Sequence, residues 1–357
     1  MRGKIAVVLG TRPEIIKMSP VIRVLEARHL DHFVLHTGQH YSYNMDRVFF
    51  ESLGLKPPDH NLGVGSGSHA EETAKMLVGI EKILVQEKPE AILVEGDTNT
   101  VLAGALAASK LHIKVGHVEA GLRSFDMKMP EEVNRIVADH VSDLLFAPTK
   151  VSEKNLLREG IDPRKIHVTG NTIVDAVQQN LELAMKAELP RGLATERYVL
   201  ATLHRQENVD DPARLKGLME ALARVHEAFE MPVLYPIHPR ARKRLAEFGV
   251  RAGEGVVLAE PVDYLTFLRL QKEATLVLTD SGGVQEEACI LGVPCVTLRE
   301  NTERPETVEV GANSLAGTDP ASVLSAAKEM LGRRKKWENP FGDGRAAERI
   351  VDILECG

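Results

Sequence analysis

Short apolar runs alternate along the chain with longer amphipathic stretches. In the first 170 residues these runs are Ile5–Leu9, Phe33–Thr37, Ala91–Glu95, Lys114–Glu119, Leu144–Pro148 and Lys165–Gly170. The first intervening stretch places apolar residues at helical spacing, from Ile15 to Leu25, with Pro13 near its start. This alternation predicts βαβ units and a parallel sheet that is buried on both faces.

The same alternation starts again after a polar, largely helical stretch from Asn171 to Arg197. The later runs are Tyr198–Leu203, Pro232–Pro236, Gly255–Leu258, Thr275–Thr279 and Pro294–Leu298. A length of 357 residues fits two domains of ordinary size. We therefore predict an α/β protein of two doubly wound parallel-sheet domains that face a cleft, the first spanning 1–170 and the second starting at 171.

Ligands of such sheets bind beyond the carboxyl ends of the strands. The first strand is followed by Gly10-Thr11-Arg12-Pro13-Glu14, and Lys17 lies about one helical turn further on. The start of a helix offers N–H groups to an anion, and Arg12 and Lys17 add full charges. The segment is neither a G-x-G-x-x-G nor a Walker A motif, and taken alone it is better explained as a solvated helix start.

Three carboxylates follow other strands of the first domain. Asp97 lies in Glu95-Gly96-Asp97-Thr98, Glu119 lies at the end of a predicted strand, and Glu131 starts a predicted helix. Each alone is better explained by a structural role such as helix capping. Grouped carboxylates, however, suit acid/base chemistry on a sugar, because neighbouring like charges raise one pKa and let an acid and a base coexist.

The second domain carries the strongest local signal, Thr279-Asp280-Ser281-Gly282-Gly283-Val284-Gln285-Glu286-Glu287. A buried strand leads into Ser-Gly-Gly and a helix, and these small residues let a diphosphate approach the backbone N–H groups. Glu287 can accept hydrogen bonds from ribose hydroxyls. Arg299 and Arg304 can neutralise the phosphates.

Two histidines also end predicted strands of the second domain. His204 is followed by the cation Arg205, and His238 lies in Tyr235-Pro236-Ile237-His238-Pro239. Both positions are on the predicted ligand side of the sheet. A loop histidine that is merely hydrogen-bonded explains His238 equally well.

Composition restricts the partners. The chain has 44 basic and 51 acidic residues and a net charge of −7, which disfavours nucleic acid while leaving room for a local basic pocket. Its three cysteines form no C-x-x-C pair, as expected of reduced thiols in a cytoplasmic protein. The apolar run Ile5–Leu9 is too short for a signal-peptide core or a membrane span.

Seven motifs occur in order along nearly the whole chain: GTRPE-II-K, EGDT, HVEAGLR, PEE-x-NR, HR-x-EN, SGG-x-QEE and TERPE. In this combination the chain resembles the non-hydrolysing UDP-N-acetylglucosamine 2-epimerase family, whose GT-B fold has two Rossmann-like domains. The resemblance implies a homodimeric isomerase that interconverts UDP-GlcNAc and UDP-ManNAc without a metal or nicotinamide cofactor. It also implies that the second domain ends at 344 and that a C-terminal helix within 345–357 crosses back to the first domain.

The resemblance assigns roles to the site residues. The catalytic set is Asp97, Glu119 and Glu131 as acid/base groups, with His204 near the leaving diphosphate. The set that binds the UDP-sugar is Arg12, Lys17, His238, Phe267, Ser281, Gly282, Gly283, Glu287 and Arg304. Within this set Phe267 matches a uridine-pocket position, Glu287 the ribose, and Arg304 the nucleotide and the closed domain interface.

The family's route eliminates UDP to give 2-acetamidoglucal and then adds it back. The sequence leaves open which carboxylate is the base and which the acid. A GT-B glycosyltransferase with a UDP-sugar donor is the nearest alternative, followed by a hydrolysing epimerase and a non-catalytic UDP-sugar sensor. A dehydrogenase is disfavoured because no G-x-G-x-x-G follows the first strand of either domain.

Overall fold

The computed structural model describes residues 3–38, 49–189, 197–333 and 337–356. Its internal contacts divide the chain into two compact units. Unit 1 comprises residues 1–179 and 341–357, and unit 2 comprises residues 180–340.

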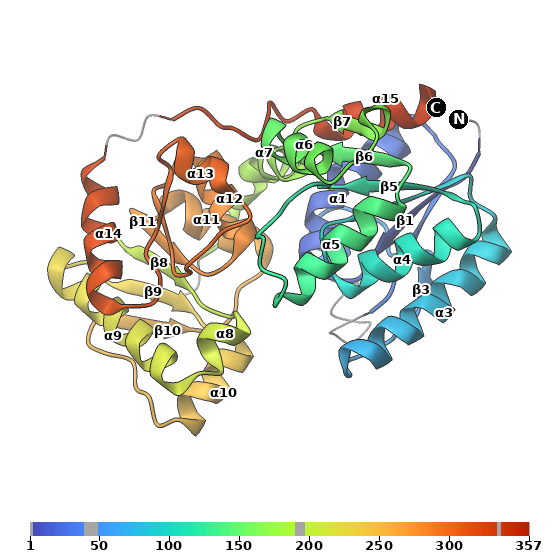
Figure 1. Cartoon of the computed structure of the whole chain (residues 1–357). Helices are drawn as coiled ribbons and strands as arrows, with labels where there is room; N and C mark the ends of the chain where they lie inside the picture. The colour runs from blue at the N-terminus through green and yellow to red at the C-terminus, as the bar shows by residue number, and fades with distance from the viewer. Residues whose placement is uncertain (1–2, 39–48, 190–196, 334–336, 357) are drawn as a thin grey trace. The chain divides into compact units, whose positions relative to one another are not determined.

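Unit 1 is built on a seven-stranded parallel sheet in the order β3-β2-β1-β4-β5-β6-β7 (Figure 1). Its strands are β1 Ile5–Leu9, β2 His32–His36, β3 His60–Asn61, β4 Ala91–Glu95, β5 Lys114–Val118, β6 Leu144–Ala147 and β7 Ile166–Val168. The strand order reverses between β1 and β4, which is where a doubly wound sheet places its ligand. All five residues of β1 and of β4 are buried, as continuous apolar runs require.

Helices α1 Arg12–Ala27, α3 His69–Glu87, α4 Asn99–Lys110, α5 Pro130–Val141, α6 Lys150–Arg158 and the 3-10 turn Pro163–Lys165 lie between these strands in the chain. Helix α7 Thr172–Lys186 follows β7 and crosses the boundary between the two units at residue 180, and the C-terminal α15 Ala346–Cys356 belongs to unit 1. The last helix packs against α1 (Figure 1). Asp175 of α7 accepts hydrogen bonds from the N–H groups of Ala346 (3.2 Å) and Ala347 (3.0 Å), so a carboxylate holds the start of α15.

Unit 2 has a six-stranded parallel sheet in the order β10-β9-β8-β11-β12-β13. Its strands are β8 Val199–Thr202, β9 Val233–Pro236, β10 Val256–Ala259, β11 Leu276–Thr279, β12 Cys295–Thr297 and β13 Asn313–Leu315. Its helices are α8 Gln206–Val209, α9 Pro212–Phe229, α10 Pro239–Glu247, α11 Tyr264–Glu273, α12 Gly282–Leu291, α13 Pro305–Glu309 and α14 Pro320–Gly332. Leu218 and Leu222 of α9 and Val323 of α14 are fully buried in the core of this unit.

The predicted fold class, two doubly wound parallel-sheet domains, is confirmed. All eleven predicted strands are present, with ends shifted by no more than two residues. Two strands were not predicted, β3 and β13, and both are polar edge strands of two and three residues with no apolar run to reveal them. Among the described residues, no helix combines the length and the apolar character that a membrane crossing needs.

Candidate functional site

The turn between β1 and α1 is closed by a buried glutamate. A Cβ atom at Gly10 would lie 2.0 Å from the Thr100 hydroxyl oxygen, so only glycine fits there. Glu14 accepts hydrogen bonds from the N–H groups of Gly10 (2.7 Å) and Thr11 (2.6 Å) and from the Thr98 hydroxyl (2.6 Å). Burial raises the pKa of Glu14 to about 7. The N–H groups of Gly10 and Thr11, which the sequence suggested for an anion, are therefore already bonded to Glu14.

Lys17 lies between two buried glutamates rather than at the surface. Its Nζ forms an ion pair with Glu119 Oε2 and lies 3.3 Å from Glu95 Oε1. Asn171 Nδ2 donates to the same Glu119 oxygen at 3.3 Å. Burial raises the pKa of Glu95 well above its usual range; Lys17 opposes this shift, and the charge of Glu119 adds to it.

Two further predicted residues of unit 1 are Arg12, which contacts an aromatic ring, and Glu119, which has an unusual backbone conformation. The Arg12 guanidinium carbon lies 5.5 Å from the centre of the Phe49 ring at the start of α1. Glu119 directly follows β5 and has φ of 68°, a left-handed conformation that is uncommon for residues other than glycine. Such backbone strain, of order 1–3 kcal/mol, is found preferentially at functional sites.

Asp97 follows β4 and is held by α5. Its Oδ2 accepts a hydrogen bond from Arg135 Nε at 3.0 Å, and its main-chain oxygen accepts one from Asn134 Nδ2 at 2.9 Å. Arg135 also donates to Glu132 Oε2 at 2.5 Å. Arg135 lies on the same face of α5 as Glu131, and its carboxylate partners are Glu132 and Asp97. Glu131, in the first turn of α5, is half-buried, and its side chain makes no hydrogen bond or ion pair within the described residues.

In unit 2 the main anchor is Asp280, which directly follows β11 and is fully buried. Its oxygens accept hydrogen bonds from the main-chain N–H groups of His204 and Arg205, both at 3.1 Å, and from Asn208 Nδ2 at 3.2 Å. His204 Nδ1 lies 3.0 Å from Asp280 Oδ1. Burial works to raise the pKa of Asp280, but the histidine ring and these donors outweigh it and lower that pKa.

The two predicted histidines of unit 2 lie together. The His204 side chain is 43% exposed, and its ring centre lies 6.3 Å from that of His238. His238 caps α10 by accepting the Arg240 N–H at 3.3 Å. Asp280, the buried partner of His204, was assigned no role from the sequence, although this residue lies within the Thr279–Glu287 motif.

Arg304 lies over the start of α12. A Cβ atom at Gly282 would lie 3.2 Å from the Arg304 guanidinium carbon, whereas one at Gly283 would meet no atom within 4 Å. Arg304 Nε is 3.2 Å from Glu286 Oε1. Ser281, the N-cap residue, forms no side-chain cap hydrogen bond. The structure therefore brings Ser281, Gly282, Gly283 and Arg304 together.

Arg299 has a carboxylate partner. It is buried and donates two hydrogen bonds to Glu303, at 3.0 and 2.7 Å. The pairing is bidentate, and the expected contact of Arg299 with phosphate stays a prediction. Glu303 also lies 3.5 Å from Arg304 NH1, so the pair supports the loop that carries Arg304.

Glu287 and Phe267 are linked through one helix. Gln271 of α11 donates to Glu287 Oε2 at 2.6 Å, and Phe267 lies one turn earlier on the same helix. Glu287 is buried and Phe267 is half-buried. This arrangement places the predicted ribose and uridine residues on the adjoining helices α11 and α12.

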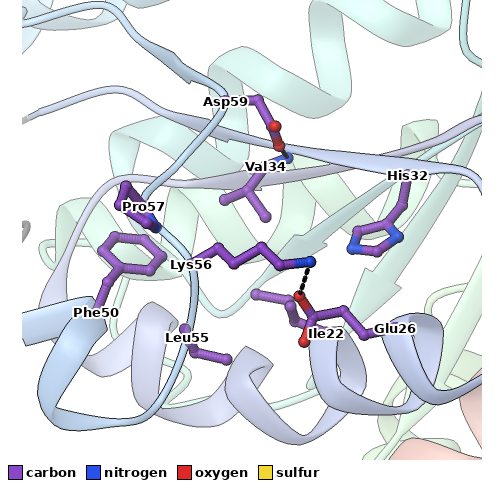
Figure 2. Close-up of a pocket in the computed structure, with 9 residues that line it drawn as sticks. All are labelled: Ile22, Glu26, His32, Val34, Phe50, Leu55, Lys56, Pro57 and Asp59. Atoms are coloured by element: carbon purple, nitrogen blue, oxygen red, sulfur yellow. Dashed lines mark hydrogen bonds and ion pairs between the residues drawn. The ribbon is translucent and has the colours of Figure 1, made fainter.

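A cavity elsewhere in unit 1 does not contain these residues. It has a volume of about 110 Å³ and lies between the end of α1 and the beginning of β2 (Figure 2). Figure 2 shows Lys56 reaching across it to Glu26, at 3.1 Å. Pockets that bind small-molecule ligands usually have volumes of roughly 300–1,000 Å³. The cavity is thus too small for a nucleotide sugar, and none of the predicted site residues lines it. Within the described part of the chain, no three His, Cys, Asp or Glu side chains are grouped to hold a metal ion.

Two doubly wound parallel-sheet units, with the predicted site residues at their strand ends, define a protein of the GT-B class. A family model described as UDP-N-acetylglucosamine 2-epimerase matches residues 23–355. The UDP-N-acetylglucosamine 2-epimerase of Methanocaldococcus jannaschii is 56% identical over 99% of each chain. A crystal structure of the enzyme from that organism, in complex with UDP-GlcNAc and UDP, superposes with a TM-score of 0.94, covering 99% of this chain and 100% of that one at 55% identity. A Pseudomonas aeruginosa UDP-2,3-diacetamido-2,3-dideoxy-D-glucuronate 2-epimerase is 45% identical over 98% of this chain and 99% of its own. The chain belongs to the UDP-N-acetylglucosamine 2-epimerase family.

Proposed function

We propose that this protein is a non-hydrolysing UDP-N-acetylglucosamine 2-epimerase that interconverts UDP-GlcNAc and UDP-ManNAc. The observation that carries the proposal is the group of carboxylates at the ends of β4 and β5 and at the start of α5, in a chain of this family. The related enzyme from M. jannaschii was crystallised with UDP-GlcNAc and UDP, which supports the choice of sugar nucleotide.

The reaction requires carboxylates and a held diphosphate. The proton on carbon 2 is not next to a carbonyl group, so a carboxylate alone removes it poorly. Departure of UDP from carbon 1 leaves positive charge there and acidifies that proton. Elimination gives 2-acetamidoglucal and UDP, and protonation from the opposite face followed by re-addition of UDP gives the epimer.

Unit 1 supplies the proton-transfer groups in this proposal. Asp97 is paired with Arg135, and Glu119 with Lys17, so each carboxylate is held beside a cation. Glu131 stands at the N-terminus of α5, without a side-chain partner among the described residues. We assign proton removal and return at carbon 2 to these three carboxylates. Lys17 serves them as a counter-charge, and Arg12 is the cation of α1 assigned to the phosphates.

Unit 2 supplies the diphosphate site in this proposal. The start of α12, at Gly282 and Gly283, offers backbone N–H groups, and Arg304 adds a cation beside them. Ser281, the N-cap residue, has its own N–H bonded to the Thr279 hydroxyl at 2.9 Å, so its side chain is the group assigned to the phosphates. Asp280 engages His204 Nδ1 and so orients the ring, whose Nε2 donates to the departing diphosphate when the imidazole is protonated. Preorganised donors of this kind are usually a large catalytic term.

The remaining nucleotide contacts fall to three side chains. His238, beside His204, is assigned to the same diphosphate. Phe267 and Glu287 are assigned to the uridine and its ribose, the latter held by Gln271.

The test is to incubate the purified protein with UDP-GlcNAc in D₂O, without metal or nicotinamide, and to follow the reaction by proton NMR. We expect UDP-ManNAc to form and deuterium to replace hydrogen at carbon 2 of both sugar nucleotides. Free N-acetylmannosamine with UDP would instead identify a hydrolysing enzyme. UDP binding without exchange or product would favour a glycosyltransferase, and turnover only of the 2,3-diacetamido glucuronate would assign the activity of the P. aeruginosa relative.

We further propose that the protein acts as a homodimer in the cytoplasm. Cys289 and Cys295 are buried free thiols and Cys356 is an exposed one, as is usual for proteins of a reducing compartment. Light scattering after size exclusion checks the first statement: a mass of one chain, 39.2 kDa, at micromolar concentration would contradict it.

A further inference from the structure

Helix α5 carries three charged residues at intervals of four. Glu131, Arg135 and Asp139 therefore lie on one face, on successive turns. Arg135 holds Asp97. Asp139, one turn further into the protein, is fully buried and contacts the middle of β5.

The partner of Asp139 is His117 of β5, which is also fully buried. Its Nδ1 lies 2.7 Å from Asp139 Oδ1, and its Nε2 lies 2.8 Å from the main-chain oxygen of Gly96. A carbonyl oxygen only accepts, so Nε2 carries a proton. The other oxygen of Asp139 is 2.7 Å from Arg123 NH2, which keeps this carboxylate ionised, so Nδ1 carries a proton as well. The ring is therefore an imidazolium.

The charges around His117 agree with this protonation state. Burial alone works to lower its pKa, but Asp139 and the Gly96 oxygen outweigh burial and the opposing charge of Arg123, and the pKa is raised. Asp139 faces the ring from α5, Gly96 from the β4–α4 turn, and Arg123 approaches through Asp139.

The pair holds both turns from which predicted catalytic carboxylates project. Gly96, with φ of 84°, immediately precedes Asp97. Asp139 Oδ2 also accepts the N–H of Gly121 at 3.2 Å; Gly121 has φ of 83° and lies two residues after the left-handed Glu119. One buried ion pair thus fixes a peptide beside Asp97 and a peptide beside Glu119.

We propose that His117 and Asp139 are positioning residues for epimerisation: a buried imidazolium–carboxylate pair that sets the Asp97 and Glu119 turns in their reactive geometry. The inference rests on the proposed function, because it assigns the pair to that same site. A displacement of about 1 Å at a reacting group can cost ~10²-fold in rate. The pair holds the two turns of unit 1, whereas the proposed diphosphate site belongs to unit 2, so nucleotide binding should be largely independent of the pair.

The kinetic test uses His117→Gln and Asp139→Asn in the full chain. We expect kcat for UDP-GlcNAc to fall ~10²-fold in each, while KM and the Kd for UDP change less than ~3-fold. Asp143→Asn is the control, because Asp143 accepts the Val115 N–H at 3.0 Å near the beginning of the same strand, away from both turns. It should keep the wild-type kcat. Wild-type kcat in His117→Gln, or an equal loss in Asp143→Asn, would overturn the proposal.

A second readout does not depend on activity. In wild-type protein labelled with ¹⁵N-histidine, we expect one histidine, absent from His117→Gln, to keep protons on both ring nitrogens at pH 8. A neutral His117 ring at that pH would overturn the imidazolium assignment even if a variant fails to fold. If the wild type epimerises no UDP-GlcNAc, the proposed function fails, whereas this spectrum still decides whether the buried pair exists.

Discussion

Two buried carboxylates at corresponding places in the two units are in opposite electrostatic states. Glu95 ends β4, the strand beside β1 in unit 1, and Asp280 follows β11, the strand beside β8 in unit 2. The pKa of Glu95 is raised and that of Asp280 is lowered, although both side chains are nearly or fully buried. Burial is therefore not what separates them.

The difference lies in the donors that each carboxylate receives. Asp280 accepts two main-chain N–H groups and an asparagine N–H, and it faces His204. Glu95 lies 3.3 Å from Lys17, a cation that it shares with Glu119, and the charge of Glu14 adds to its raised pKa. In unit 1, several carboxylates lie around Lys17, and such grouping raises the pKa of Glu95. In unit 2, Asp280 is a hydrogen-bond acceptor that holds the surrounding N–H donors in place.

The largest effect should come from neutralising the carboxylates of unit 1. We expect Asp97→Asn, Glu119→Gln and Glu131→Gln each to lower epimerisation by ~10²–10⁴-fold, the range that general acid/base groups contribute, while UDP binding stays within ~3-fold of wild type. NMR rates and calorimetric UDP titrations measure the two quantities. Glu182→Gln is the control, because this carboxylate is exposed and pairs with Lys186 on the surface. Near-wild-type turnover in all three site variants would remove the acid/base assignment.

The second effect tests the two buried carboxylates against each other. We expect Asp280→Asn to lower the free energy of unfolding at pH 8 by ~1–3 kcal/mol, because the amide turns donors toward buried N–H groups that need an acceptor. Glu95→Gln should cost less than ~1 kcal/mol, because it removes a charge that burial disfavours. Urea unfolding of both variants measures the difference. Equal losses would show that the two carboxylates are held alike, contrary to the comparison.

How far the sequence predicts this molecule depends on the kind of signal. Most strands could be predicted because an apolar run of five residues, such as Ile5–Leu9, is long enough to be recognised in the sequence. The two-residue edge strand β3 is too short for that. The motif residues were found by their position after these strands. In unit 2 the structure then brings together His204 with His238, and Arg304 with Gly282.

The ion pairs could not be predicted, because the sequence does not show which of its many charged side chains are buried together. Arg299 pairs with Glu303, and Arg135 pairs with Glu132 and Asp97. The Arg299–Glu303 and Arg135–Glu132 pairs are local, at i,i+4 and i,i+3 spacing, whereas the Arg135–Asp97 pair joins residues 38 positions apart, which only tertiary packing can bring together. The burial of Asp280 could have been predicted from the sequence, because this aspartate lies between a buried strand and the Ser-Gly-Gly turn.

A third prediction concerns the pH dependence of stability. The folded protein raises the pKa of Glu14 from 4.5 to about 7, so the fold binds this proton more tightly than the unfolded chain does. The resulting stability is complete below pH 4.5 and is lost as the pH rises toward 7, by about 3 kcal/mol at ~1.4 kcal/mol per pKa unit. Glu14→Gln should flatten the decline between pH 5 and 8 in urea unfolding. Glu71→Gln, which removes an exposed carboxylate whose pKa is lowered, should leave it in place.

The smallest effect separates two neighbouring glycines at the start of α12. Gly283→Ala meets no atom within 4 Å, so in the free protein it should raise the free energy of unfolding by ~0.4–1 kcal/mol. The same methyl group would occupy the space through which a diphosphate approaches the N–H groups, and UDP binding should weaken about tenfold, or ~1.4 kcal/mol. Gly282→Ala meets the Arg304 guanidinium at 3.2 Å, so it should gain less stability and weaken UDP binding by displacing that cation. Calorimetry with UDP and thermal unfolding without it distinguish the two causes. A Gly283→Ala protein that binds UDP like wild type would place the diphosphate away from this helix, and unit 2 would then hold its donors for another purpose.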